Sequence, residues 1–204
     1  RTFSSAASDV YKRQIVSWRM TLNPVFMAIV PLFHCNGWNH TWMMPVLGGS
    51  LVCCRDITSQ AIYDAIADEG VQYFGGAPIV LNMIVNTNDT ERREFDHTVE
   101  VFTAGAPPAP ATLLKIEKLG FNVTQVYGLT ETYGHVTECY WENQKWSELE
   151  GEQRAAIKAR QGVAFPMMEH ITVMDQSMSE VPKDGKTQGE IMTVSYTHLR
   201  AHET

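Results

Sequence analysis

Short apolar runs of strand length alternate along this chain with amphipathic stretches of helical length. The apolar runs are VFMAIVPLF (25–33), SLVCC (50–54), VQYFGGAP (71–78), VEVFTAGAP (99–107), VTQVYG (123–128) and ITVMD (171–175). Each run has the length of a buried strand. Pro31 predicts that the first strand ends early, because proline has no N–H to donate to a neighbouring strand.

The stretch TSQAIYDAIADEG predicts a complete helix. Thr58 suits the N-cap, Ile62 and Ile66 lie on one face at helical spacing, and Gly70 suits the position just after the last turn. Two further helices are expected after strands that run into Gly-Ala-Pro, namely IVLNMIVN (79–86) and ATLLKIEKLG (111–120).

Strands that alternate with helices predict an α/β fold built on a mostly parallel sheet flanked by helices. In such sheets, ligands bind at the carboxyl ends of the strands. GAP (105–107) and YGLTET (127–132) fall at two such ends. A charged stretch, ELEGEQRAAIKARQG (148–162), predicts a solvated surface helix that is capped by Gly162.

Composition narrows the class of protein. With 204 residues, of which 44% are hydrophobic and 19% charged, the chain suits a soluble globular unit. It contains no apolar run long enough to predict a transmembrane segment. A formal charge of −7 without a Lys/Arg cluster argues against nucleic acid as a partner. Its four cysteines lack metal-binding spacing, so we expect reduced core thiols and a cytoplasmic location.

Both ends of the chain resemble sequence of a different origin from its middle. SSAASDVYKRQ (4–14) resembles an in-frame translation of a transposase sequencing adapter, and VSYTHLRAHET (194–204) resembles the opposite adapter. The second reading frame restricts residue 193 to Ser, Pro, Thr or Ala, and Thr193 satisfies it. We therefore expect 1–14 and 193–204 to be adapter-derived, residues 1–3 being unplaced, and the protein itself to occupy 15–192.

The YGLTET stretch carries groups suited to a phosphate and a metal. Gly105 and Gly128 allow a ligand to approach the backbone closely, and Pro107 suits the first turn of an anion-attracting helix. Thr130 can donate to a phosphate oxygen. Glu131 fits beside a phosphate only if a cation lies between them, and Mg²⁺ commonly takes one or two carboxylates plus phosphates. The structural alternative is a helix cap, with Thr130 as N-cap and the carboxylate in the first turn.

These residues also belong to segments that resemble the motifs of a known enzyme family. TAGAPP (103–108), followed by YGLTET (127–132), resembles the adenylate-forming enzymes. PLFHCNGW (31–38) and VPKDGKTQGEI (181–191) narrow the resemblance to acyl-CoA synthetases that act on short, medium or aromatic acids. The similarity spans 15–192, and it implies the central part of the AMP-binding N-terminal domain.

The resemblance implies a site and a reaction. Gly105, Ala106 and Pro107 match the segment along the adenine, while Tyr127 and Gly128 match the strand whose tyrosine stacks on the other face of the base. The implied reaction joins a small carboxylic acid to coenzyme A through an acyl-adenylate and releases AMP and pyrophosphate.

Two catalytic residues follow from the same resemblance. Thr130 matches the phosphate-binding hydroxyl, and Glu131 matches the magnesium ligand. The implied cofactors and co-substrates are ATP, Mg²⁺ and coenzyme A.

The residues expected on the acyl side of the site are less specific to the family than those of the nucleotide side. His34 and Trp38 match the segment beside the acyl and pantetheine channels, and they would share a helix face if CNGW were helical. Without the resemblance, a packed aromatic and a hydrogen-bonded core histidine are the simpler interpretation. Tyr133 and Gly134 follow the magnesium motif and are expected to border the acyl pocket, as is His135.

The chain also departs from the family pattern. It lacks the phosphate loop that ends in Pro-Lys-Gly, the Tyr-x-Thr-Gly-Asp motif and the C-terminal lysine domain. We therefore expect the 204-residue chain to be inactive by itself. A peptide-synthetase adenylation domain, a luciferase-like enzyme and a non-catalytic nucleotide-binding module remain alternatives, although FHCNGW is not expected in the first two.

Overall fold

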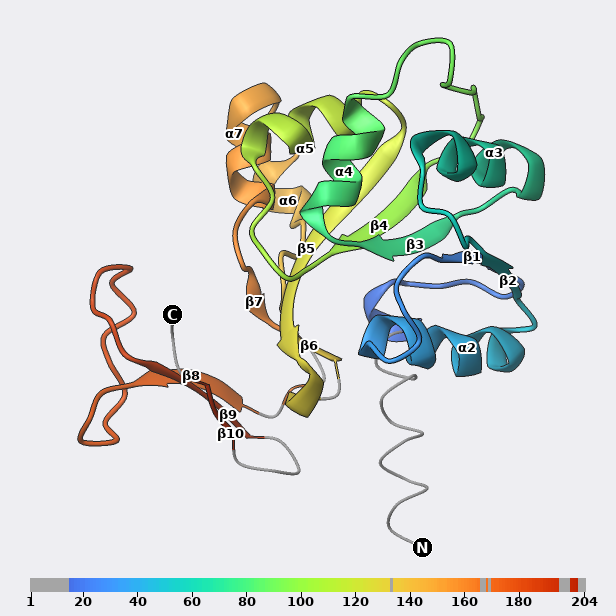
Figure 1. Cartoon of the computed structure of the whole chain (residues 1–204). Coiled ribbons are helices and arrows are strands. Elements are labelled where there is room, and N and C mark those ends of the chain that lie inside the picture. Colours follow the sequence, from blue (N-terminus) through green and yellow to red (C-terminus); the bar gives the residue numbers. More distant parts are fainter. Residues whose placement is uncertain (1–14, 133, 166–167, 169, 195–198, 202–204) are drawn as a thin grey trace, which may run out of the picture.

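The main body of the chain is built on one large sheet. The computed structural model describes residues 15–132, 134–165, 168, 170–194 and 199–201. Within these residues, seven strands form the sheet in the order β2-β1-β3-β4-β5-β6-β7 (Figure 1). Their bounds are β1 Val25–Ala28, β2 Ser50–Cys53, β3 Tyr73–Gly76, β4 Val99–Thr103, β5 Phe121–Leu129, β6 Gly134–Glu138 and β7 Val163–Ala164.

The first five of these strands are parallel, and the last two are not. β1 pairs in parallel with β2 and β3, and β3, β4 and β5 continue the parallel order. β6 pairs antiparallel with β5 and also with β7. The mostly parallel α/β sheet expected from the alternating pattern is therefore confirmed, with an antiparallel extension at one end.

Helices cover both faces of this sheet. α3, α4, α5 and α7 lie over one face, while α2 lies over the other (Figure 1). The helices are α2 Cys35–Leu47, α3 Ser59–Glu69, α4 Pro78–Val85, α5 Pro110–Glu117, α6 Asn143–Trp146 and α7 Gly151–Lys158. Among the helices that the structure describes, none is long and apolar enough to cross a membrane.

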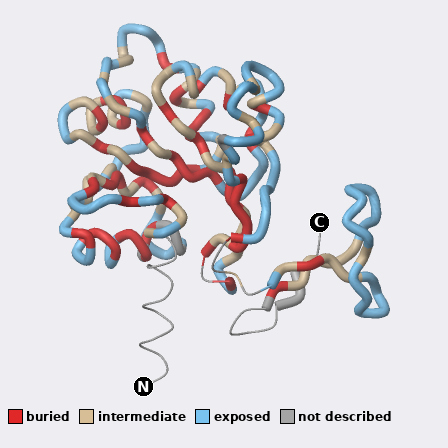
Figure 2. Tube along the Cα trace, turned by 180° about the vertical axis from the view of Figure 1, so that it is seen from behind, coloured by how far each residue is buried: buried red, intermediate tan, exposed pale blue. Residues whose placement is uncertain are grey.

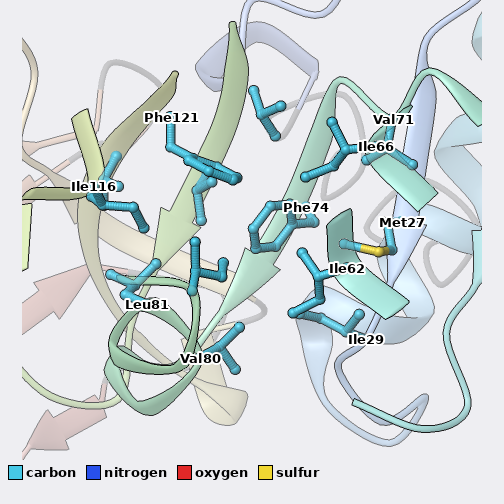
Figure 3. Close-up of a cluster of buried hydrophobic side chains, with 14 of the residues drawn as sticks. Met27, Ile29, Ile62, Ile66, Val71, Phe74, Val80, Leu81, Ile116 and Phe121 are labelled. Carbon is cyan, nitrogen blue, oxygen red and sulfur yellow. The ribbon is translucent and has the colours of Figure 1, made fainter. Parts of the chain in front are cut away.

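The two faces have separate apolar cores because side chains alternate along each strand. Adjacent residues on three strands enter opposite cores: Met27, Phe74 and Val101 face α3, α4 and α5, whereas Phe26, Tyr73 and Phe102 face α2. Figure 3 shows the first core, where side chains from helices α3, α4 and α5 meet those of the strands. Burial of each such side chain contributes roughly 1.5 to 3 kcal/mol. The buried strands run through the centre of the main body in Figure 2.

The local predictions for α3 and β1 are confirmed. The Thr58 side chain accepts a hydrogen bond from the Ala61 N–H at 3.1 Å, and Gly70 ends the helix with a φ of 66°. β1 ends at Ala28, ahead of Pro31. Cap chemistry and proline placement are local effects, so a short stretch of sequence suffices to predict them.

The prediction for the charged stretch 148–162 is partly wrong. α7 ends at Lys158 with Ala159 as its C-cap, so Gly162 does not cap it. A Cβ atom at Gly162, whose φ is 83°, would lie 1.9 Å from the carbonyl oxygen of Glu138. This glycine therefore lets the chain pass close to β6. The helix also buries Ala155 and Lys158, so one of its faces is not solvated.

A buried charge network holds α7 against the sheet. Lys158 Nζ contacts the Glu117 carboxylate and donates to Asn122 Oδ1 at 2.7 Å. Arg154 Nε donates to the same carboxylate at 2.9 Å. The Lys158 side chain is only 4% exposed, and burial lowers the pKa of its ammonium group. For Glu117, burial raises the pKa, but hydrogen bonds from Lys158 and Arg154 outweigh it, so the net pKa is lowered.

A small antiparallel sheet lies beside the main body. Within the described residues it contains β8 (His170–Met174), β9 (Glu190–Val194) and β10 (Leu199–Ala201), in the order β10-β9-β8. Figure 2 shows that the long connection between β8 and β9 is mostly exposed. In that connection, Asp184 Oδ1 accepts hydrogen bonds from the backbone N–H groups of Lys186 and Thr187, both at 2.8 Å.

Replacing Lys158 tests the charge network. We expect Lys158→Met to lower the free energy of unfolding of the full-length protein by about 3 kcal/mol, because Asn122 Oδ1 and Glu117 lose a buried partner. The matched control is Arg154→Met, which removes a 31% exposed partner of the same carboxylate and should cost about 1 kcal/mol or less. Urea denaturation measures both. Equal losses would contradict the buried role of Lys158.

Candidate functional site

The two motifs of interest meet at one edge of the sheet. β4 ends at Thr103, which pairs with Gln125 of β5. From there the TAGAPP segment leaves the sheet, while β5 continues for four residues to Leu129. Because β4 and β5 are parallel, the loop that begins at Ala104 starts beside the continuation of β5 that carries Tyr127 and Gly128.

The loop after β4 is open to solvent. Gly105, Ala106 and Pro107 are exposed. Gly105 has a φ of 90°, and a Cβ atom built there would meet no atom within 4 Å. The backbone is therefore accessible on this side, as close approach of a flat ligand requires.

Pro107 does not lie in the first turn of a helix, contrary to expectation. α5 begins at Pro110, with Ala109 as its N-cap. A residue that precedes proline is pushed away from helical backbone angles, and both Pro107 and Ala109 precede prolines. By contrast, α4 begins at Pro78, the last residue of GGAP (75–78). The loop between β4 and α5 is therefore longer than the loop between β3 and α4, and it is mostly exposed.

β5 and β6 form a hairpin around the YGLTET turn. Tyr127 is half-buried and pairs with Thr137, and the register shifts between Tyr127 and Gly128. A Cβ atom at Gly128 would lie 2.1 Å from the carbonyl oxygen of Gly134. The structure thus gives Gly128 a steric role inside the hairpin. Close approach of a ligand, as expected from the sequence, is not needed to explain this glycine.

The two threonines of the turn have different roles. Thr132 is buried, and its Oγ1 accepts a hydrogen bond from the Leu129 N–H at 2.9 Å. The same oxygen lies 2.9 Å from the carbonyl oxygen of Leu129 and 2.8 Å from that of Gly134, within donating distance of both. Thr130 is exposed. Thr132 therefore closes the turn, while the Thr130 hydroxyl is exposed and has no hydrogen-bond partner among the described residues.

The helix-cap alternative for Thr130 and Glu131 is not supported. Residues Thr130–Thr132 form a single 3₁₀ turn, and the chain enters β6 at Gly134. No α-helix follows whose first turn the carboxylate could stabilise. The Glu131 side chain is exposed, and it has no hydrogen bond or ion pair with any residue in the described part of the chain.

The chemistry of Glu131 fits a magnesium ion held jointly by protein and phosphate. No group of three or more His, Cys, Asp or Glu side chains that could hold a metal occurs among the residues described by the structure. A metal held by protein groups alone is therefore not indicated there. Mg²⁺ commonly takes only one or two carboxylates and completes its shell with phosphates and water. One carboxylate beside one hydroxyl, both exposed and without a partner among the described residues, matches that donor set.

The acyl-side residues are only partly placed. His34 is exposed and is the N-cap of α2, with extended backbone angles, so it lies just before the helix and not on one of its faces. The side chain of Trp38 and the whole of Tyr133 lie outside the described residues. Gly134 is buried at the start of β6, and its carbonyl oxygen lies beside the Thr132 hydroxyl. CNGW lies at the start of α2, but the side chain of Trp38 is not described, so the pairing of His34 with Trp38 on a shared helix face stays a prediction.

One polar cluster near the hairpin was missed by the sequence analysis. The Oγ atom of Ser17 lies 3.0 Å from Nε2 of His135, and it also contacts the carboxylate of Glu138. These residues are 118 and 121 positions apart in the chain, so no local pattern could have connected them.

Curated relatives of this chain are CoA ligases. A peroxisomal acetate/butyrate–CoA ligase of Arabidopsis thaliana is 44% identical over 177 residues, covering 86% of this chain and 31% of the relative. A 2-methylpropanoate–CoA ligase of Humulus lupulus is 42% identical over 179 residues, covering 87% and 32%. A peroxisomal trans-cinnamate:CoA ligase of Petunia hybrida is 40% identical over 178 residues, covering 87% and 31%. The chain thus spans about a third of each relative.

Solved structures share the fold at lower identity. A long-chain-fatty-acid-CoA ligase of Archaeoglobus fulgidus matches with a TM-score of 0.72 and 18% identity, over 93% of this chain and 37% of the other. An O-succinylbenzoate coenzyme A synthetase of Bacillus subtilis, in complex with ATP and magnesium, matches with a TM-score of 0.71 and 17% identity, over 94% and 38%. A family model described as AMP-binding enzyme matches residues 1–200, and this chain therefore belongs to the AMP-binding enzyme family.

Proposed function

We propose that this chain is part of an acyl-CoA synthetase. The enzyme would convert a carboxylic acid, ATP and coenzyme A into acyl-CoA, AMP and pyrophosphate. The observation that carries the proposal is the convergence of TAGAPP (103–108) and YGLTET (127–132) at one sheet edge, in a chain about 40% identical to CoA ligases.

The first step forms an acyl-adenylate. A carboxylate oxygen attacks the α-phosphorus of ATP, and pyrophosphate leaves. In the second step the CoA sulfur attacks the acyl carbon, and AMP leaves. In this proposal Gly105, Ala106 and Pro107 lie along the adenine, and the ring of Tyr127 covers its other face. The accessible Gly105 backbone and the half-buried Tyr127, which flank the same edge, support these positions.

Thr130 and Glu131 serve the phosphates. The Thr130 hydroxyl donates to a phosphate oxygen, and the Glu131 carboxylate is one ligand of Mg²⁺. When bound, the metal supplies charge neutralisation and orientation of the phosphates. The protein holds both side chains outward through Thr132, whose hydroxyl ties Leu129 to Gly134. The single turn therefore presents a donor and a carboxylate side by side.

The acid is proposed to be small or aromatic. The relatives carry the names of acetate, butyrate, 2-methylpropanoate and trans-cinnamate ligases. His34, Trp38, Tyr133 and Gly134 are retained as acyl or pantetheine residues, a role that stays a prediction. One methylene changes discrimination by only about 1 to 3 kcal/mol, so related acids are expected to compete.

The compartment and the ends of the chain also remain predictions. Cys53, Cys54 and Cys139 are free thiols, which agrees with a reducing compartment. The expectation that they are core thiols is wrong for Cys53, which is exposed, and for Cys54, which is half-buried; of these three, only Cys139 is buried. We propose the cytoplasm, although two of the three relatives described above are named as peroxisomal. Localisation of a fluorescently tagged full-length protein distinguishes the two. Sequencing the gene in its genomic context tests whether residues 1–14 and 193–204 are adapter-derived.

The proposed activity is tested with the full-length enzyme. ATP–pyrophosphate exchange that depends on acetate, butyrate, 2-methylpropanoate, hexanoate, benzoate or cinnamate reports adenylation, and thioester formation with CoA reports the second step. Both reactions are expected. Exchange without transfer to CoA would favour another adenylate-forming enzyme, and nucleotide binding without exchange would favour a non-catalytic module.

Replacing Glu131 tests the metal role. Glu131→Gln removes the negative charge while keeping the shape of the side chain. We expect adenylation to fall by about 100-fold or more, because charge stabilisation of the phosphates is lost. Glu148→Gln, at another exposed glutamate, is the control and should leave the rate unchanged. Near-normal exchange in the Glu131 variant would refute its role as a metal ligand.

Two glycine variants separate a ligand role from a fold role. Gly105→Ala places a methyl group in open space at a positive φ, so it should cost about 1 to 2 kcal/mol of stability while raising the KM for ATP severalfold. Gly128→Ala would force β5 away from β6 and should lower the melting temperature far more. Thermal melting and ATP titration measure both effects. An unchanged KM in Gly105→Ala would remove this glycine from the nucleotide site.

A further inference from the structure

A polar cluster lies beside the β5–β6 hairpin, in which the half-buried Ser17 meets two buried side chains. Ser17 Oγ donates a hydrogen bond to Glu138 Oε2 and lies 3.0 Å from His135 Nε2. The same imidazole nitrogen is 3.5 Å from Glu138 Oε2. The side chains of His135 and Glu138 are 4% and 7% exposed. Ser17 precedes β1, whereas the other two residues are on β6, so the cluster joins two distant parts of the chain.

The hydrogen atoms of this cluster can be assigned from donor counts. A serine hydroxyl has one hydrogen, and that of Ser17 is directed to Glu138. The tautomer with a hydrogen on Nε2 is therefore the one that lets His135 donate to the Ser17 oxygen. Glu138 and Ser17 both contact this one nitrogen. In a Ser-His-acid triad the acid contacts the opposite ring nitrogen, so this cluster holds the imidazole in place and does not activate the serine.

The imidazole of His135 is also held by aromatic rings. It meets the ring of Phe102 edge-on at 5.6 Å and lies 4.7 Å from the ring of Phe165. Phe102 immediately precedes Thr103, the last residue of β4, and Phe165 follows β7. His135 thus connects the hairpin with the end of β4, with the segment after β7 and, through Ser17, with the segment before β1.

The hairpin needs such support because it projects beyond its neighbours. β5 continues past the last residue of β4, and among the described residues β6 pairs with the short strand β7 through Thr137 and Glu138. Nearer the tip, His135 pairs with Gly128, and the turn Thr130–Thr132 lies between these two residues in the chain. Any displacement of His135 therefore moves the turn.

We propose that Ser17, His135 and Glu138 are positioning residues for the Thr130–Thr132 turn. Their hydrogen bonds hold the hairpin in the orientation in which Thr130 and Glu131 reach the phosphates and the metal. This inference rests on the proposed function. It gives the segment that contains Ser17 a role in orienting the phosphate-binding turn, although this segment lies more than 100 residues earlier in the sequence.

The test uses Ser17→Ala in the full-length enzyme. Its matched control is Ser59→Ala, which removes another serine-to-glutamate hydrogen bond, to Glu91 at 3.0 Å, on α3. We expect the kcat of acid-dependent pyrophosphate exchange to fall about tenfold to 100-fold in the Ser17 variant, because misplacement of the turn by about 1 Å has effects of that size. The Mg²⁺ concentration for half-maximal activity should rise as well, while the KM for the acid changes little. Ser17→Thr, which keeps the hydroxyl, should restore kcat.

A second measurement does not depend on activity. Hydrogen exchange of peptides covering 126–135 reports protection of the Leu129 N–H, which is bonded to Thr132 Oγ1. Exchange should accelerate in Ser17→Ala and in His135→Ala, but not in Ser59→Ala or in His135→Gln, which retains an N–H donor. If the wild-type enzyme shows no adenylation activity but exchange is faster in Ser17→Ala and His135→Ala, the positioning role is upheld and the proposed function is refuted. Unchanged exchange, or equal kinetic losses in both serine variants, would overturn the positioning role.

Discussion

The parallel pairing of β4 with β5 is the constraint on which the candidate site depends. Parallel strands end at the same edge of a sheet, so the register that places Thr103 opposite Gln125 also brings the two segments that follow into proximity. β5 is longer than β4, and its extra residues carry Tyr127 and Gly128 beyond the end of β4, where they pair with β6. Without this register, the TAGAPP loop and the YGLTET turn would be separate surface features.

A parallel sheet exists only if both of its faces are covered. Alternation of side chains along β1, β3 and β4 meets this requirement, since adjacent residues such as Phe26 and Met27 enter different cores. At the antiparallel end of the sheet, β6 is mostly buried and the short strand β7 is exposed. There the structure relies on close backbone contact at Gly128 and Gly162 and on buried polar groups around His135. The apolar cores thus hold the sheet together, while polar contacts orient its projecting hairpin.

Local sequence was sufficient for most elements of the fold. The cap at Thr58, the left-handed Gly70 and the early end of β1 follow from interactions within a few residues. Prediction was wrong where a distant segment intervened or a local effect was overlooked. Gly162 resembled a helix cap, yet it is needed because β6 passes within contact distance. Pro107 resembled a helix start, but successive prolines delay α5 to Pro110.

For the site, the sequence by itself determined which chemical groups are available: two threonines, one glutamate and the glycines around them. It also placed them at strand ends, because the alternation of strands and helices can be read without coordinates. Only the tertiary structure decided that the hydroxyl of Thr132 forms the hydrogen bonds that close the turn, whereas Thr130 and Glu131 are exposed to solvent. It alone brought Ser17 to His135, since hydrogen bonds between residues 118 positions apart exist only after the sheet has formed.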